Sequence, residues 1–133
     1  MLFFMVFNFL SRNQIYNMHW IRLNNNEVLE KLVKESYNQP VIIYKHSTRC
    51  SISSMVLQRL ERSWKEEDME GINTYFVDVI SNRDISNQIA KIFNVMHESP
   101  QLFIVSKGDS FYDASHSEIT YPELKKQLQV MKV

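Results

Sequence analysis

Short apolar runs alternate with amphipathic segments along this chain, and that order leaves few folds open. Runs rich in β-branched and aromatic residues predict strands at 20–23, 41–46, 74–80, 101–105 and 110–114. Apolar residues at helical spacing predict helices at 26–37, 50–67, 85–93 and from Thr120 onward. Strand–helix–strand units require parallel crossovers, whereas the last two strands are joined by a tight turn and must be antiparallel. The order therefore predicts an α/β protein with a central mixed β-sheet flanked by helices on both faces.

Local signals along the chain agree with this order, which is that of the thioredoxin-like fold. Gly108 lies in the turn 106–109, where a positive φ is needed. Thr120 and Glu123 form a capping box that opens the last helix. Two helices carry apolar stripes that we expect to face the core, and their residues are Ile52, Met55, Val56, Leu60 and Trp64 in the first and Ile85, Ile89, Ile92 and Phe93 in the second.

The composition excludes several classes of function. Lys plus Arg and Asp plus Glu each number 15, so the formal net charge is zero, which argues against nucleic acid as the main partner. One cysteine cannot form a disulfide within the chain. The four histidines show no spacing typical of metal ligands, so we expect neither a metal nor a resident cofactor.

The first 17 residues form a segment apart from the predicted domain, which we place at 18–133. Residues 2–10 are almost wholly apolar, but this run is too short to cross a bilayer, which takes ~20 apolar residues. We interpret 1–17 as an extension upstream of a natural start at Met18. The alternative is a short apolar arm that anchors the chain to a membrane surface.

Cys50 is the candidate nucleophile. It follows a predicted strand and opens a predicted helix, where unpaired N–H groups and the helix dipole favour a thiolate. Arg49 and His46 are possible sources of positive potential, and Thr48, Ser51 and Ser53 are possible hydrogen-bond donors to the sulfur. The alternative is a buried cysteine that acts as a small apolar side chain, but the polar neighbours favour the reactive interpretation.

The Ser99–Pro100 pair precedes the strand 101–105. In a thioredoxin fold a cis proline at this place lies beside the nucleophile and exposes backbone to a substrate. On sequence alone a trans bond is strongly preferred, because cis accounts for only ~5–6% of such bonds. His97 and Glu98 precede the pair. His116, after the turn, is either a proton donor to a leaving thiol or a surface residue.

Three segments resemble the monothiol bacilliredoxin, or YtxJ-like, family of the bacillithiol system: KHSTRCSIS at 45–53, DVISNRDISNQIAKIFNVMHESPQ at 78–101 and DASHSEIT at 113–120. The resemblance implies that Cys50 is the nucleophile and Pro100 a cis proline. The family motif is Thr-Cys-Pro-Ile-Ser, so Arg49 and Ser51 depart from it. We therefore expect the substrate-binding residues to be His46, Thr48, Arg49, Ser51, Ser53, Ser99, Pro100 and His116.

The same resemblance implies a function. Such proteins reduce mixed disulfides between proteins and bacillithiol, so the expected partners are S-thiolated proteins and a low-molecular-weight thiol acting as co-substrate. We expect a cytoplasmic monomer with neither a nucleic-acid nor a membrane partner. Two alternatives stay open: a non-catalytic thioredoxin-fold adaptor that binds partners at the Pro100 groove, and a glutaredoxin-like protein that shares an iron–sulfur cluster across a dimer.

Overall fold

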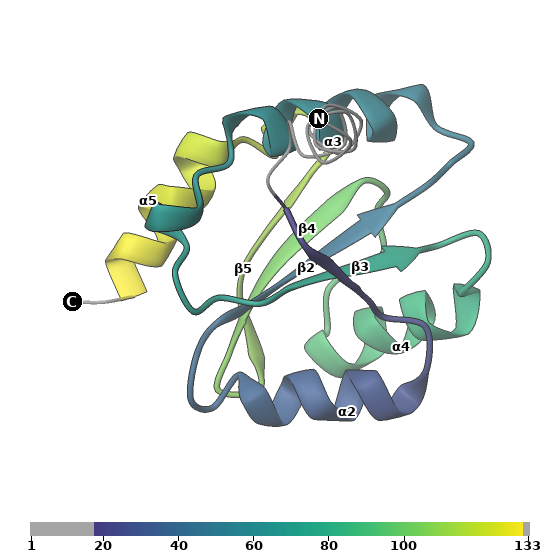
Figure 1. Cartoon of the computed structure of the whole chain (residues 1–133). Helices are drawn as coiled ribbons and strands as arrows, with labels where there is room; N and C mark the ends of the chain where they lie inside the picture. The colour runs from purple at the N-terminus through teal and green to yellow at the C-terminus, as the bar shows by residue number, and fades with distance from the viewer. Residues whose placement is uncertain (1–17, 132–133) are drawn as a thin grey trace, which may run out of the picture.

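A computed structural model describes residues 18–131, in which helices and strands alternate as the sequence predicts (Figure 1). The predicted extension 1–17 lies outside the described residues. The elements in chain order are β1 (Trp20–Arg22), α2 (Asn26–Glu35), β2 (Val41–His46), α3 (Ser51–Ser63), β3 (Thr74–Asp78), α4 (Arg83–Phe93), β4 (Gln101–Ser106), β5 (Asp109–Ser115) and α5 (Tyr121–Met131).

The five strands form one mixed sheet in the order β1-β3-β2-β4-β5. β3 pairs in parallel with both β1 and β2, whereas β4 is antiparallel to β2 and to β5. The β4–β5 turn places Lys107 at φ 53° and Gly108 at φ 81°, so glycine occupies a left-handed position as predicted. The predicted α/β architecture is therefore confirmed.

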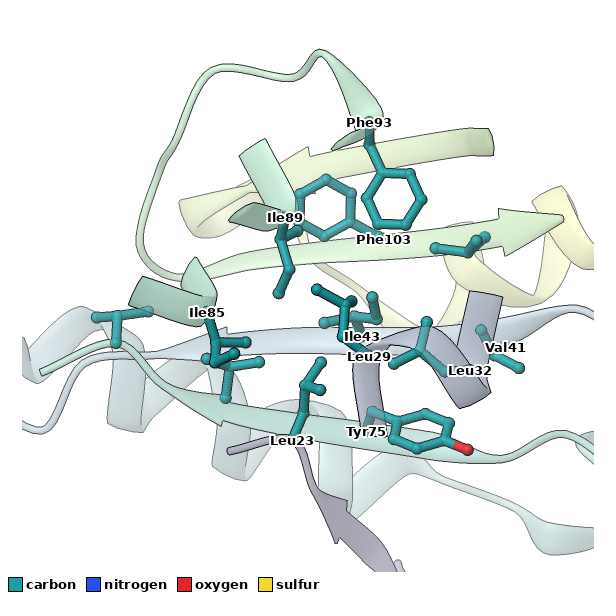
Figure 2. Close-up of a cluster of buried hydrophobic side chains, with 13 residues drawn as sticks. Leu23, Leu29, Leu32, Val41, Ile43, Tyr75, Ile85, Ile89, Phe93 and Phe103 are labelled. Carbon is teal, nitrogen blue, oxygen red and sulfur yellow. The ribbon is translucent and has the colours of Figure 1, made fainter. Parts of the chain in front are cut away.

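Each face of the sheet has its own apolar core. Side chains alternate along β2, so Val41 and Ile43 face α2 and α4 while Ile42 and Tyr44 face α3 and α5. Figure 1 shows the two helix pairs on opposite sides of the sheet. Figure 2 shows the first core, in which Ile43 and Phe103 of the sheet meet side chains from α2 and α4. Every residue of β2 is buried, as expected for a central strand.

The structure corrects the prediction for α3 in its length and in its buried face. The helix ends at Ser63, because Trp64 adopts an extended backbone at ψ 133°, and a short 3₁₀ helix follows at Glu66–Asp68. Ile52 and Met55 are exposed, whereas Ser53 is buried. The buried side therefore runs through Ser53 and begins with a polar residue.

A similar correction applies to α4. Three residues of its predicted stripe are buried, but Ile92 is 47% exposed. Positions 85, 89 and 93 repeat every four residues and face the sheet, whereas position 92 lies at the margin of that stripe. Ile92 therefore lies outside the core against which the other three pack.

Candidate functional site

Cys50 is the residue from which α3 begins. Its backbone is extended, with φ −115° and ψ 115°, and its carbonyl accepts hydrogen bonds from Ser53 N at 3.1 Å and Ser54 N at 3.3 Å. Its side chain makes no capping hydrogen bond, and the residue is partly exposed. The only thiol of the chain therefore lies at a helix N-terminus, where unpaired N–H groups gather, and is not packed in a core.

A buried polar cluster joins the end of β2 to the first turn of α3. Ser53 Oγ lies 2.7 Å from His46 Nδ1 and accepts a hydrogen bond from Ser47 N at 3.1 Å. Because Ser53 Oγ accepts from that backbone N–H, its own proton is free to be donated to His46 Nδ1. The same hydroxyl has a second lone pair, so it can also accept from Nδ1, and the cluster is satisfied with either tautomer of the ring. Burial lowers the pKa of His46, opposed by the charge of Asp78, so the neutral ring is favoured.

Tyr44 adds a second connection between the same two elements. Its hydroxyl donates to the carbonyl of Ser53 at 3.0 Å, from within the core. Burial raises the pKa of Tyr44 well above its ordinary value, and the negative charge of Glu61 raises it further. The phenol therefore stays protonated and acts as a structural donor. Together with the buried polar cluster, this hydrogen bond fixes the start of α3, and hence Cys50, against the sheet.

Pro100 lies at the end of the sheet where β2 leads toward Cys50. The Ser99–Pro100 peptide bond is cis, as the resemblance implies. Gln101 pairs with Lys45 in the β2–β4 ladder, so the preceding residue, Pro100, lies level with His46. Its carbonyl accepts a hydrogen bond from His116 N at 3.0 Å. The sheet topology thus brings Pro100 and the last residue of the strand before Cys50 to the same end of the sheet.

The segment before Pro100 is held by a buried glutamine. Gln101 is 1% exposed, and its amide donates to the carbonyl of Met96 at 3.1 Å and accepts from Glu98 N at 3.2 Å. Ser99 Oγ is buried and has no hydrogen-bond partner among the described residues. The glutamine therefore fixes residues 96–98, immediately before the proline, to the sheet.

The side chains of the remaining predicted residues take no part in this cluster. The side chains of Thr48, Arg49 and Ser51 are exposed and make no hydrogen bond to other described residues. The backbone N–H of Arg49 donates to Ser47 Oγ at 3.3 Å, which shapes the turn. These three side chains face solvent and do not form part of the buried cluster.

His116 lies at the edge of the site and pairs with an acid. Its Nε2 is 3.6 Å from Glu98 Oε1, and both side chains are nearly half exposed. Arg59 of α3 donates to the carbonyls of Ser117 and Ile119, which holds the segment after His116 against α3. His116 is therefore a surface residue beside the proline segment.

Sequence reasoning missed Lys45 and Gln101. Both are fully or almost fully buried, and both contact the segment before Pro100. For Lys45 the available signal was its place in the predicted strand VIIYKH, after three aliphatic residues and a tyrosine, at a position that alternation assigns to a buried face.

The described residues show no other candidate centre of comparable chemistry. Residues 18–131 contain no group of three or more His, Cys, Asp or Glu side chains placed to hold a metal ion. None of the helices in that range combines the length and apolarity that crossing a membrane requires.

Comparisons with known proteins agree with this geometry. Residues 21–124 match the family model described as monothiol bacilliredoxin BrxC. A solved structure described as a candidate oxidoreductase with a thioredoxin fold is 30% identical, with a TM-score of 0.73, covering 86% of this chain and 97% of that one. Thioredoxin from Fasciola hepatica is 16% identical (TM-score 0.63; 82% and 96% covered), and thioredoxin from Malassezia sympodialis 12% (TM-score 0.68; 87% and 93%). The fold is thus that of thioredoxin, and the chain belongs to the monothiol bacilliredoxin family.

Proposed function

We propose that this chain reduces mixed disulfides between proteins and bacillithiol, with Cys50 as the nucleophile. Its family and fold are those of thiol oxidoreductases. The observation that carries the finer proposal is the position of Cys50, a partly exposed thiol at the N-terminus of α3, at the sheet end that also bears Pro100. Thiol–disulfide exchange needs a sulfur that a disulfide can reach, and the partial exposure of Cys50 at the start of α3 supports that role.

The reaction has two exchange steps. The Cys50 thiolate attacks the bacillithiol sulfur of the mixed disulfide, a Cys50–bacillithiol bond forms, and the protein sulfur leaves as a thiolate that takes a proton from water. A second bacillithiol thiolate then attacks the bacillithiol sulfur held on Cys50. That step releases oxidised bacillithiol and regenerates the Cys50 thiolate. An external thiol is required because the chain has no second cysteine.

The polar cluster around Ser53 supports the first step by fixing geometry. Attack requires the sulfur to approach along the S–S axis, and a helix start that is held at several points limits the sulfur's range of positions. Ser53 bonds to His46 and Ser47, and Tyr44 bonds to Ser53. We assign these residues to holding α3, and the exposed Thr48, Arg49 and Ser51 to contacting the substrate.

The experiment is turnover of a model protein that carries one bacillithiol mixed disulfide, followed by intact mass spectrometry. With bacillithiol as reductant, catalytic amounts of the chain should remove the adduct, and Cys50→Ser should not. A matched substrate carrying glutathione tests the choice of small thiol. Equal rates for wild type and Cys50→Ser would refute the proposal and favour the adaptor role.

A further inference from the structure

Lys45 is a buried cation whose place in the fold the proposed reaction does not explain. It is 0% exposed, and it lies on the sheet face opposite α3, with Ile43 and α4. Its Nζ donates to the carbonyl of Ser86 at 3.0 Å and lies 3.2 Å from His97 Nδ1 and 5.5 Å from the centroid of the Phe103 ring. No described carboxylate pairs with it.

Such a group carries an energetic cost. Burial lowers the pKa of Lys45 to about 8, so near neutral pH it remains mostly protonated inside the protein. An apolar side chain of similar length would fill the same space without desolvating a charge. The contacts of the lysine are therefore the place to look for what it contributes.

Those contacts lead to the segment before Pro100. Lys45 binds His97 in that segment and Ser86 in α4, while Ser86 Oγ also lies 3.3 Å from His97 Nδ1. The cross-strand partner of Lys45 is Gln101, which binds the same segment at residues 96 and 98. Two adjacent buried polar side chains thus hold the chain that enters the proline.

Part of the backbone of this segment has no hydrogen-bond partner among the described residues. Neither the N–H nor the C=O of Ser99 bonds to another described residue. An extended peptide that lies alongside can pair with such groups, as in strand addition. How well it pairs depends on the orientation of the segment.

We propose that Lys45 is a positioning residue for binding of the protein substrate: through His97, it holds the segment 96–100 in the orientation that presents the Ser99 backbone to the substrate beside Cys50. This inference rests on the proposed function. Lys45 acts from the far side of the sheet and touches neither the sulfur nor the small thiol. It therefore affects docking of the protein chain and leaves the chemistry of Cys50 unchanged.

The test compares Lys45→Met with Lys31→Met, the same substitution at an exposed lysine of α2. In Lys45→Met, the KM for a protein mixed disulfide should rise about fivefold to tenfold, the effect of losing one hydrogen bond of ordinary net strength. The kcat and the rate of alkylation by iodoacetamide should stay within about twofold of wild type. Lys31→Met should match wild type throughout.

Hydrogen exchange gives a measure that does not depend on turnover. The amides of Glu98 and His116, whose acceptors are Gln101 Oε1 and the Pro100 carbonyl, should exchange faster in Lys45→Met. The amide of Ser53, in α3, should not. His97→Ala removes the Lys45–His97 contact by changing the exposed partner, so it should reproduce both the higher KM and the faster exchange. The double variant should show no larger effect than either single variant.

Three results would overturn the inference. The first is unchanged KM and exchange in a folded Lys45→Met. The second is a fall in kcat or alkylation, which would mean that the lysine acts on the sulfur. If Lys45→Met does not fold, unchanged exchange in His97→Ala is the third. Failure of the wild type to reduce any mixed disulfide would instead refute the proposed function, and the exchange data would still report on positioning.

Discussion

Replacing Ser53 by alanine removes the centre of the buried cluster that fixes Cys50. The side chain is 0% exposed, and its oxygen serves both His46 Nδ1 and the backbone N–H of Ser47. Alanine would leave two polar groups without partners in a largely buried place. Each costs about 1–3 kcal/mol, so we expect a loss of about 3 kcal/mol in the free energy of unfolding. For a domain of this size that is roughly a 10 °C fall in Tm.

Urea unfolding of Ser53→Ala measures this loss, with Ser54→Ala as the matched control. Ser54 is the next residue of α3, and its side chain has no described hydrogen-bond partner. The control should match wild type or gain a few tenths of a kcal/mol from helix propensity. Stability within about 0.5 kcal/mol of wild type would refute the reasoning, since no network of that kind would then be present.

Further predictions concern the buried lysine and the hairpin. Burial lowers the pKa of Lys45 from 10.5 to about 8 in the folded state. The free-energy cost of burying its charge is therefore greatest below pH 8, and it disappears as the pH rises toward the pKa of the unfolded state, 10.5. The stability of Lys45→Met relative to wild type should therefore fall by roughly 2 kcal/mol between pH 7 and pH 10 in urea unfolding, and a constant difference would contradict this. Gly108→Ala should cost about 1–2 kcal/mol, because φ is 81° and an added Cβ would lie 2.5 Å from the Tyr37 hydroxyl. Calorimetry measures that loss, and an unchanged Tm would exclude the strained turn.

The parts of the fold that local chemistry determines could be predicted from the sequence. The strand 41–46 is observed with the predicted bounds, because a β-branched run between Pro40 and a polar turn has few alternatives. The hairpin is placed by Gly108 for a similar reason. The position of Cys50 at the start of a helix follows from the change in periodicity after His46.

The parts that depend on distant partners could not be predicted. Periodicity alone favoured Ile52 and Met55 as the buried side of α3, but Ser53 is buried there because its partners come from the end of β2. Lys45 is another example, since Ser86 and His97 lie 41 and 52 residues away in sequence. A polar residue in a core is accounted for only when the element that satisfies it is known.

The central claim is that Cys50 accepts the small thiol, and a single-turnover experiment tests it most directly. The chain is mixed with one equivalent of a protein–bacillithiol mixed disulfide in the absence of free thiol, and both proteins are weighed by intact mass spectrometry. The account predicts that the chain gains one bacillithiol, on a peptide containing Cys50, while the substrate loses one. An unchanged substrate, or a disulfide between Cys50 and the substrate protein itself as the main product, would contradict it.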